Sequence, residues 1–162
     1  MKTRIISAFP GTGKSYFYNE NKSTTIDSDS SEFSWVKDDQ GNNTKERNPN
    51  FPQNYIEHIK ENIGKYDFIF VSSHKEVREA LKYNCIFFYL IYPDVNRKEE
   101  FVQRYIDRGS PNGFIKLIES NWDEWIKECE FEMYGCSNVR MILPNLSNEL
   151  SHIIASENGD SL

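Results

Sequence analysis

A glycine-rich run that follows an apolar, strand-like stretch is the part of the chain best suited to chemistry. Its residues are Ala8-Phe9-Pro10-Gly11-Thr12-Gly13-Lys14-Ser15. A strand, a glycine loop, Gly-Lys-Ser and a helix in this order are typical of a loop that binds the phosphates of ATP or GTP. Its backbone N–H groups surround the β-phosphate, the Lys14 ammonium reaches the β- and γ-phosphates, and the Ser15 hydroxyl is a ligand of Mg²⁺. We therefore predict that Pro10 to Ser15 bind a nucleotide with Mg²⁺; a glycine turn with an incidental lysine leaves the order unexplained.

Two aspartates, separated by one residue, follow the second strand-like stretch, Ser23–Ile26. Asp27 and Asp29 are therefore expected at the carboxyl end of a strand, where open α/β sheets place their active sites. One carboxylate can accept the proton of an attacking hydroxyl, and the other can hold Mg²⁺ through water or orient the base. We predict Asp29 as the general base and Asp27 as the acid that supports metal or substrate. The alternative is that one of the two only caps the following turn or helix.

Two arginines four residues apart, Arg104 and Arg108, precede a Gly-Ser-Pro break between two predicted helices. Residues four apart share one face of a helix, and guanidinium groups make paired hydrogen bonds to phosphate oxygens. We predict that both arginines stabilise the transferring phosphoryl group and that residues 104–113 form a mobile lid over ATP. The alternative is a solvated helix face on which Arg104 pairs with Glu100, and Arg108 with Asp107 or water.

A polar segment, residues 37–53, separates the second strand from the next long helix and is rich in Asp, Asn and Pro. This composition predicts neither strand nor helix, so the segment is either an idle surface loop or an insertion on the substrate side of the site. Arg47 is the candidate for contact with an acceptor phosphate. Phe33, Trp35 and Phe51 flank the polar stretch, and we predict that Trp35 stacks on a base or sugar. Packing in the core explains Phe33 equally well.

The third strand-like stretch, Tyr66–Val71, runs into Ser-Ser-His74 rather than into an aspartate. The metal-binding carboxylate is therefore expected from Asp27 or Asp29, and one of the serines is expected to cap the next helix. His74 is a candidate for substrate contact, although a histidine in the first turn of a helix more often has no catalytic role. Trp122 and Trp125 are three residues apart on a predicted helix, which is typical of a packing stripe.

The composition fits one compact domain, because 38% of the 162 residues are hydrophobic and 14% are aromatic. The longest apolar run is far shorter than the roughly 20 residues that span a bilayer, and the first strand begins near the N-terminus, so we expect neither a membrane anchor nor a signal peptide. The formal charge of −6 argues against sequence-independent binding to DNA. Cys85, Cys129 and Cys136 show no metal-ligand spacing, and Cys85 lies in a strand-like run. Buried, reduced thiols and a cytoplasmic location are therefore predicted.

Strand-like and helix-like patterns alternate, which predicts a three-layer α/β fold with a five-stranded, mainly parallel sheet and helices on both faces. The expected strands are Thr3–Ala8, Ser23–Ile26, Tyr66–Val71, Cys85–Tyr92 and Val139–Leu143. The expected helices are Lys14–Glu20, Asn54–Gly64, His74–Tyr83, Asp94–Asp107 and Asn112–Glu130. Asp94 is expected to cap the fourth of these helices. A single domain then covers residues 1–155, including a short helix after Pro144, and residues 156–162 form a flexible tail.

These motifs resemble those of the P-loop kinases of the nucleoside and nucleotide kinase type. Ala8–Ser15 is similar to their Walker A loop, Asp27-Ser-Asp29 to the acids after their second strand, and Arg104-Tyr-Ile-Asp-Arg108-Gly to their arginine-bearing lid. The layout is especially similar to the 5′-kinase domain of phage polynucleotide kinase. It is also similar to small phage and prophage P-loop kinases, which include kinases of 5-hydroxymethyluracil in DNA. The resemblance implies a P-loop kinase fold with a lid, Asp29 as the base, and lid arginines that hold phosphate.

The motifs together predict a Mg-ATP-dependent kinase that moves the γ-phosphoryl group to a hydroxyl of a nucleoside, a nucleotide or a modified base in DNA. A nucleoside monophosphate kinase is the alternative among enzymes, and it would depend on Arg47. If Arg47 does not face the site, an acceptor with a neutral hydroxyl is favoured. An NTP-binding regulatory switch with incidental hydrolysis is the alternative from another class. No membrane association and no obligate protein partner are expected.

Overall fold

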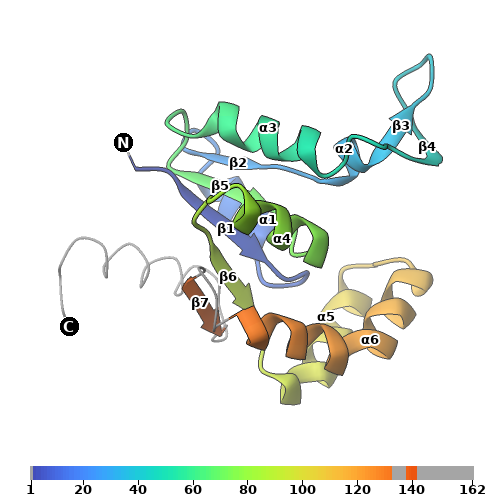
Figure 1. Cartoon of the computed structure of the whole chain (residues 1–162). Helices are drawn as coiled ribbons and strands as arrows, with labels where there is room; N and C mark the ends of the chain where they lie inside the picture. Colours follow the sequence, from blue (N-terminus) through green and yellow to red (C-terminus); the bar gives the residue numbers. More distant parts are fainter. Residues whose placement is uncertain (1, 133–137, 142–162) are drawn as a thin grey trace, which may run out of the picture.

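The computed structural model describes residues 2–132 and 138–141 and has an α/β fold around a parallel sheet (Figure 1). The strands of this sheet are β1 (Arg4–Ala8), β2 (Thr25–Asp27), β5 (Phe68–Val71), β6 (Tyr89–Tyr92) and β7 (Asn138–Met141). Their spatial order is β2-β5-β1-β6-β7, and each neighbouring pair is parallel. The predicted α/β class with a mainly parallel sheet is confirmed. The order brings the carboxyl ends of β1, β2 and β5 to the same edge of the sheet.

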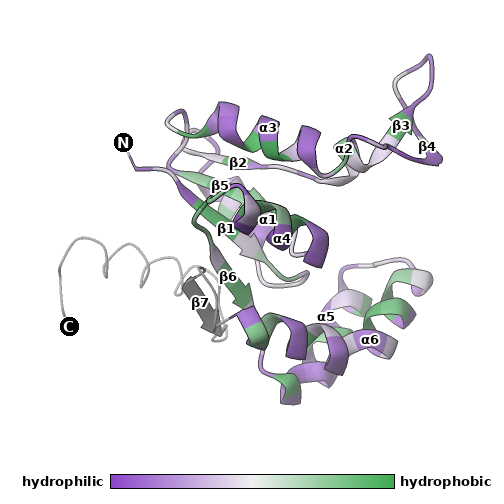
Figure 2. Ribbon diagram, viewed as in Figure 1, coloured by the Kyte–Doolittle hydropathy of each residue, from purple (hydrophilic) through white to green (hydrophobic). Residues whose placement is uncertain are grey.

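The three central strands, β1, β5 and β6, form the core of the domain because their side chains are mostly apolar on both faces. Every residue of β5 and β6 is buried. Ile6 in β1 pairs with Phe70 on one side and with Tyr89 on the other. Figure 2 shows hydrophobic residues in these strands and hydrophilic residues along the outer faces of the helices. Burial of the central strands therefore fixes the position of the loop that follows β1.

Helices flank the sheet: in Figure 1, α4 lies in front of it and α1 behind it. The helices are α1 (Lys14–Glu20), α2 (Ser31–Ser34), α3 (Gln53–Asn62), α4 (Lys75–Tyr83), the 3₁₀ helix η1 (Val95–Arg97), α5 (Lys98–Asp107) and α6 (Asn112–Phe131). The helix predicted from Asp94 to Asp107 is divided into η1 and α5. The Asp94 carboxylate accepts the N–H of Asn96 at 2.8 Å, so its predicted role as a cap is confirmed, for η1.

The break predicted between the last two helices is confirmed, because α5 ends at Asp107 and α6 begins at Asn112. Gly109 has a φ of 72°, which a glycine adopts without strain. Its N–H donates to the carbonyl of Ile106, and the N–H of Ser110 donates to the carbonyl of Tyr105, both at 2.9 Å. This pattern is a Schellman motif, which satisfies the last carbonyls of α5 and turns the chain toward α6.

The strand predicted from Cys85 begins only at Tyr89, so the expectation of a buried Cys85 thiol is wrong. Cys85 is exposed and has a φ of 53°, in the left-handed region. The reason is that α4 ends at Tyr83 and the chain turns there. The Cys85 N–H donates to the Lys82 carbonyl at 2.9 Å in this turn. Cys129 is buried as predicted.

The two described cysteines should therefore differ sharply in reactivity. Burial raises the pKa of the Cys129 thiol to about 11, which keeps it protonated near neutral pH. In the folded Cys136→Ser variant, Ellman's reagent should rapidly label one thiol, that of Cys85. A further Cys85→Ser change should remove this rapid reaction. Rapid labelling that survives the Cys85→Ser change would contradict the exposed position of Cys85.

The polar segment between β2 and α3 forms a β-hairpin, so the prediction that it contains no strand is wrong. Its strands are β3 (Trp35–Lys37) and β4 (Asn43–Arg47), which pair antiparallel. The Asp38 carboxylate closes the turn by accepting the N–H groups of Gln40 and Asn42 at 2.9 and 2.8 Å. This local turn chemistry overrides the low strand propensity of the polar residues. Figure 1 shows the hairpin at the β2 end of the sheet and α5–α6 at the opposite end.

Several predictions concern residues outside the described ranges, namely 1, 133–137 and 142–162. They are the helix after Pro144, the tail at residues 156–162, the end of the domain at residue 155, and the state of Cys136. Within residues 2–132 and 138–141, no helix is long and apolar enough to cross a membrane.

Candidate functional site

The glycine loop joins β1 to α1 and has left-handed backbone at Gly11 and Gly13, with φ values of 81° and 94°. Two side chains of α5 donate hydrogen bonds to backbone carbonyls of this loop. The Tyr105 hydroxyl donates to the Pro10 carbonyl at 2.8 Å, and the Arg104 guanidinium donates to the Gly11 carbonyl at 3.1 Å. Contacts from a helix 95 residues further along the chain therefore hold the loop in shape.

A polar cleft of about 250 Å³ lies beside this loop at the carboxyl ends of β1, β2 and β5. Its lining residues are Ala8, Pro10, Lys14, Asp27, Ser28, Asp29, Ser30, Ser72, Ser73 and His74. The structure thus brings the predicted phosphate-binding lysine together with both predicted carboxylates and with His74. The lining therefore includes one cation and two acids, which are groups that phosphoryl transfer uses.

Asp29 also stabilises the turn after β2. Its Oδ1 atom accepts the N–H of Ser31 at 2.9 Å, at the start of α2. This is the capping role that was the alternative for one of the two acids. A carboxylate has two oxygens, so the bond at Oδ1 leaves Oδ2 as an acceptor for a proton from the cleft.

Tyr55, on the buried face of α3, joins the ends of two strands at the cleft. Its hydroxyl donates to the Ser28 carbonyl at 2.7 Å and accepts the Ser72 N–H at 3.3 Å. Burial, with the nearby charges of Asp29 and Asp27, raises the pKa of Tyr55 to about 12, so the phenol stays protonated and keeps donating. One phenol therefore sets the position of both aspartates relative to the Ser-Ser-His74 segment.

Replacing Tyr55 by Phe should destabilise the protein by about 1–2 kcal/mol, because the buried Ser28 carbonyl and the partly buried Ser72 N–H both lose a partner. The measurement is urea unfolding, with Tyr83→Phe as the control because Tyr83 is 89% exposed. Tyr83→Phe should leave the midpoint unchanged. Equal midpoints for Tyr55→Phe and the native protein would show that the bridge contributes nothing to stability.

His74 lies where the cleft meets α4, and its surroundings favour the neutral imidazole. Its pKa lies below the usual value of 6.5, first because the ring is partly removed from water and further because Arg47, Arg78 and Lys14 are nearby; Glu76 opposes the shift. At neutral pH the ring can therefore donate one hydrogen bond and accept another.

The sign of this shift predicts a pH dependence. The folded-state pKa of His74 is below the unfolded value, so its contribution to stability is complete above about pH 6.5 and is lost as the pH falls toward the folded-state pKa. The free energy of unfolding should therefore fall less between pH 7 and pH 5 in His74→Gln than in the native protein. Urea titrations at several pH values measure this difference. Parallel pH profiles for the two proteins would contradict the assignment.

Trp35 and Arg47 belong to the hairpin and are not among the described residues that line the polar cleft. The Arg47 guanidinium forms an ion pair with Glu76. Its carbon Cζ lies 5.5 Å from the Trp35 ring centre and 4.7 Å from that of Phe51. Arg47 thus contacts the rings of Trp35 and Phe51 and the carboxylate of Glu76. Its charge lies near His74.

The two predicted lid arginines also lie outside the described lining of the cleft. Arg104 contacts the loop through the Gly11 carbonyl and pairs with Glu100 at 2.5 Å, as the alternative expected. Arg108 donates to the Ser110 hydroxyl at 2.7 Å, and its Cζ lies 4.8 Å from the Tyr105 ring centre. In this conformation Arg104 touches the loop and Arg108 stabilises the turn between α5 and α6.

The donor set suits a Mg²⁺ ion that arrives with a nucleotide. Within the part of the chain that the structure describes, no three His, Cys, Asp or Glu side chains cluster as a metal cage. Mg²⁺ bound to nucleotide phosphates keeps several waters and needs only one or two protein ligands. The Asp27 carboxylate lines the cleft, whereas the Ser15 hydroxyl lies in the first turn of α1, outside the described lining. Both are oxygen donors of the type that such an ion takes.

Two buried hydroxyls of the site have no hydrogen-bond partner among the described residues, Thr12 Oγ1 in the loop and Ser28 Oγ in the cleft. Thr12 is 2% exposed and Ser28 is 6% exposed. An unsatisfied buried polar group costs about 1–3 kcal/mol. Oxygens of a bound ligand would satisfy such groups, so the observation supports a binding role for this part of the molecule.

The predictions missed Tyr55 and Tyr105, whose hydroxyls hold the cleft and the loop. The available signal was weak: a tyrosine on the apolar face of a helix usually needs a partner for its hydroxyl, but the pattern does not say which one. Trp122 is fully buried, as the predicted packing stripe requires, whereas Trp125 is only partly buried.

No protein-family model matches the chain, and no curated protein or solved structure is significantly similar to it. The cleft and its residues are therefore the basis for assigning a function.

Proposed function

We propose that the protein is a Mg-ATP-dependent phosphotransferase whose acceptor is a hydroxyl of a nucleoside, a nucleotide or a base in DNA. The observation that carries the proposal is that Lys14 of the glycine loop lines one cleft with Asp27 and Asp29. Phosphoryl transfer needs a cation at the donor phosphates and a group that orients the attacking oxygen, close together.

The same proposal assigns the fold to the P-loop kinase type. The glycine loop follows β1, the middle strand of the sheet; Asp27 is the last residue of β2, and Asp29 follows this strand at the same edge. Residues 104–113, which include the turn between α5 and α6, are then the lid. Arg104 already contacts the loop, and phosphate charge would compete with Glu100 for its guanidinium.

In the proposed reaction, the acceptor oxygen attacks the γ-phosphorus of ATP. A new O–P bond forms, the bond from the γ-phosphorus to the β–γ bridging oxygen breaks, and ADP leaves. The hydroxyl proton passes to the Asp29 carboxylate. Lys14 and the loop N–H groups stabilise the phosphate oxygens, and Mg²⁺, when bound, offsets their charge.

The position of Arg47 favours an acceptor with a neutral hydroxyl over an acceptor phosphate. Arg47 is the arginine on which a monophosphate acceptor would depend, and it is paired with Glu76 and stacked against Trp35 and Phe51. Neither Arg47 nor Glu76 is among the described residues that line the polar cleft.

The test is transfer of label from γ-labelled ATP, with Mg²⁺, to nucleosides, monophosphates, 5′-hydroxyl oligonucleotides and DNA that contains hydroxymethylpyrimidines. Lys14→Ala should abolish transfer and weaken ATP binding, whereas Lys65→Ala, on an exposed turn before β5, should change neither. Label that appears only as free phosphate across the panel would overturn the kinase proposal in favour of an NTP-binding switch.

A further inference from the structure

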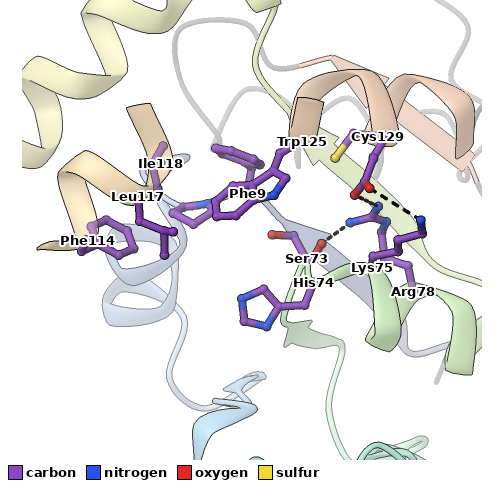
Figure 3. Close-up of a pocket in the computed structure, with 12 residues that line it drawn as sticks. Phe9, Ser73, His74, Lys75, Arg78, Phe114, Leu117, Ile118, Trp125 and Cys129 are labelled. Carbon is purple, nitrogen blue, oxygen red and sulfur yellow. Dashed lines mark hydrogen bonds and ion pairs between the residues drawn. The ribbon is translucent and has the colours of Figure 1, made fainter. Parts of the chain in front are cut away.

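A second cavity of about 260 Å³, here called the apolar pocket, adjoins the polar cleft (Figure 3). The two share Pro10, Ser73 and His74 as lining residues, so they lie next to each other at the start of α4. In Figure 3, Phe114, Leu117 and Ile118 of α6 lie at one end of the pocket, Lys75 and Arg78 of α4 lie at the other, and Phe9 lies between them.

The walls of the apolar pocket are mostly aromatic and aliphatic. They include Phe9 from the glycine loop and Phe114, Leu117, Ile118 and Trp125 from α6. Leu117 is 54% exposed, and Phe114 and Trp125 are partly buried, so these side chains do not only complete the core. Ligand sites in proteins have this character: apolar walls beside a small number of placed polar groups.

The charged residues of the apolar pocket are paired with one another. Arg78 is 3% exposed, donates to the Ser73 carbonyl, and lies 3.3 Å from Glu132 and 3.8 Å from Glu128. Lys75 lies 3.6 Å from Glu128. Both cations are thus matched by acids, and a phosphate entering the pocket would have to displace a carboxylate. The pocket is better suited to a neutral group.

We infer that the apolar pocket binds the acceptor through a neutral, planar nucleobase, which stacks on its aromatic side chains. This inference rests on the proposed function, because it assigns the acceptor of the same cleft. A base that stacks on Phe114 or Trp125, which unlike Phe9 are only partly buried, places its own substituent or its sugar near Pro10, Ser73 and His74. A hydroxyl there enters the polar cleft, in which Asp29 and Lys14 lie. Stacking provides affinity without need for charge, in agreement with the paired state of Arg78 and Lys75.

The first test fills the pocket. Leu117→Trp should raise the KM for a nucleoside acceptor by about tenfold or more, comparable to the loss of one stacked base, and leave ATP affinity unchanged. Lys116→Trp, one residue away on α6 and outside the pocket lining, is the matched control and should leave the KM unchanged. Circular dichroism checks that both variants fold. Transfer activity with an unchanged KM in Leu117→Trp would overturn the pocket assignment and leave the kinase proposal intact.

The second test measures binding without catalysis. Thymidine and 5-hydroxymethyl-2′-deoxyuridine should quench the fluorescence of Trp125, and Trp125→Phe should lose that quenching; deoxyribose, which lacks a base, should have no effect. Quenching without phosphoryl transfer would support the pocket and contradict the kinase proposal. Quenching that is equal in the native protein and Trp125→Phe, or no quenching at all, would overturn the inference. The same bases within a single-stranded oligonucleotide form a parallel arm, which distinguishes free nucleosides from DNA as their source.

Discussion

Replacing Asp29 by Asn should lower kcat by about 10²–10⁴-fold, the usual contribution of a general base. An amide cannot take the proton of the acceptor hydroxyl, so catalysis is lost at the chemical step. The fold should survive, because the amide oxygen of Asn can still accept the Ser31 N–H that Asp29 binds now. The measurement is kcat for label transfer, together with the Kd for ATP, which should change little.

Asp38→Asn is the matched control for this experiment. Asp38 also accepts backbone N–H groups in a turn, but it lies at the tip of the hairpin, outside the described lining of the cleft. Its kcat should equal that of the native protein. Asp27→Asn tests the role of the second carboxylate. Since Asp27 is proposed to support the metal, a higher Mg²⁺ concentration should partly restore kcat in this variant. A fully active Asp29→Asn enzyme would remove the role of Asp29 as base.

Replacing Gly11 by Ala should destabilise the protein by about 2–4 kcal/mol, from backbone strain and steric overlap together. Gly11 has a φ of +81°, and a Cβ atom there would lie 2.8 Å from the Cε1 atom of Tyr105 and 3.3 Å from Phe101. The Tyr105 ring cannot move away without loss of its bond to the Pro10 carbonyl. Because the loop must shift instead, the affinity for ATP should fall by about tenfold or more.

Comparison of Gly11→Ala with Gly41→Ala shows how much of the destabilisation comes from the contact with α5. Gly41 has nearly the same φ, +82°, but a Cβ atom there meets nothing within 4 Å. Its variant should lose only about 1–2 kcal/mol, the cost of a left-handed residue. Unfolding in urea compares the two variants, and isothermal titration with ATP reports on the loop. Equal destabilisation at the two glycines would show that α5 does not constrain the loop.

Local signals were sufficient for the fold class and for the central part of the site. The apolar strands β1, β5 and β6 alternate with amphipathic helices, and this periodicity alone indicates a parallel sheet. The glycine loop is recognisable because its residues are consecutive. Asp27 and Asp29 are recognisable because a strand-like stretch leads into them, and Asp27 is the last residue of β2. Parallel strands then bring the loop and the acids to one edge.

Element boundaries and the hairpin were predicted less well, because competing local interactions decide them. The apolar run from Cys85 was read as strand, but the turn at the end of α4 occupies its first residues. The hairpin was missed because its strands are polar, and the hydrogen bonds of Asp38 outweigh their weak strand propensity.

The fold class, the glycine loop and the acids near it could be predicted from the sequence, since these depend on residues that are neighbours along the chain. The tertiary structure was needed to show that Tyr105 supports the loop, that Tyr55 joins Ser28 to Ser72, and that Trp125 lines a pocket next to the cleft. These contacts join residues far apart in sequence. The packing of α3, α5 and α6 creates them, and hydrophobic periodicity indicates which face of a helix is buried but not which residues it meets.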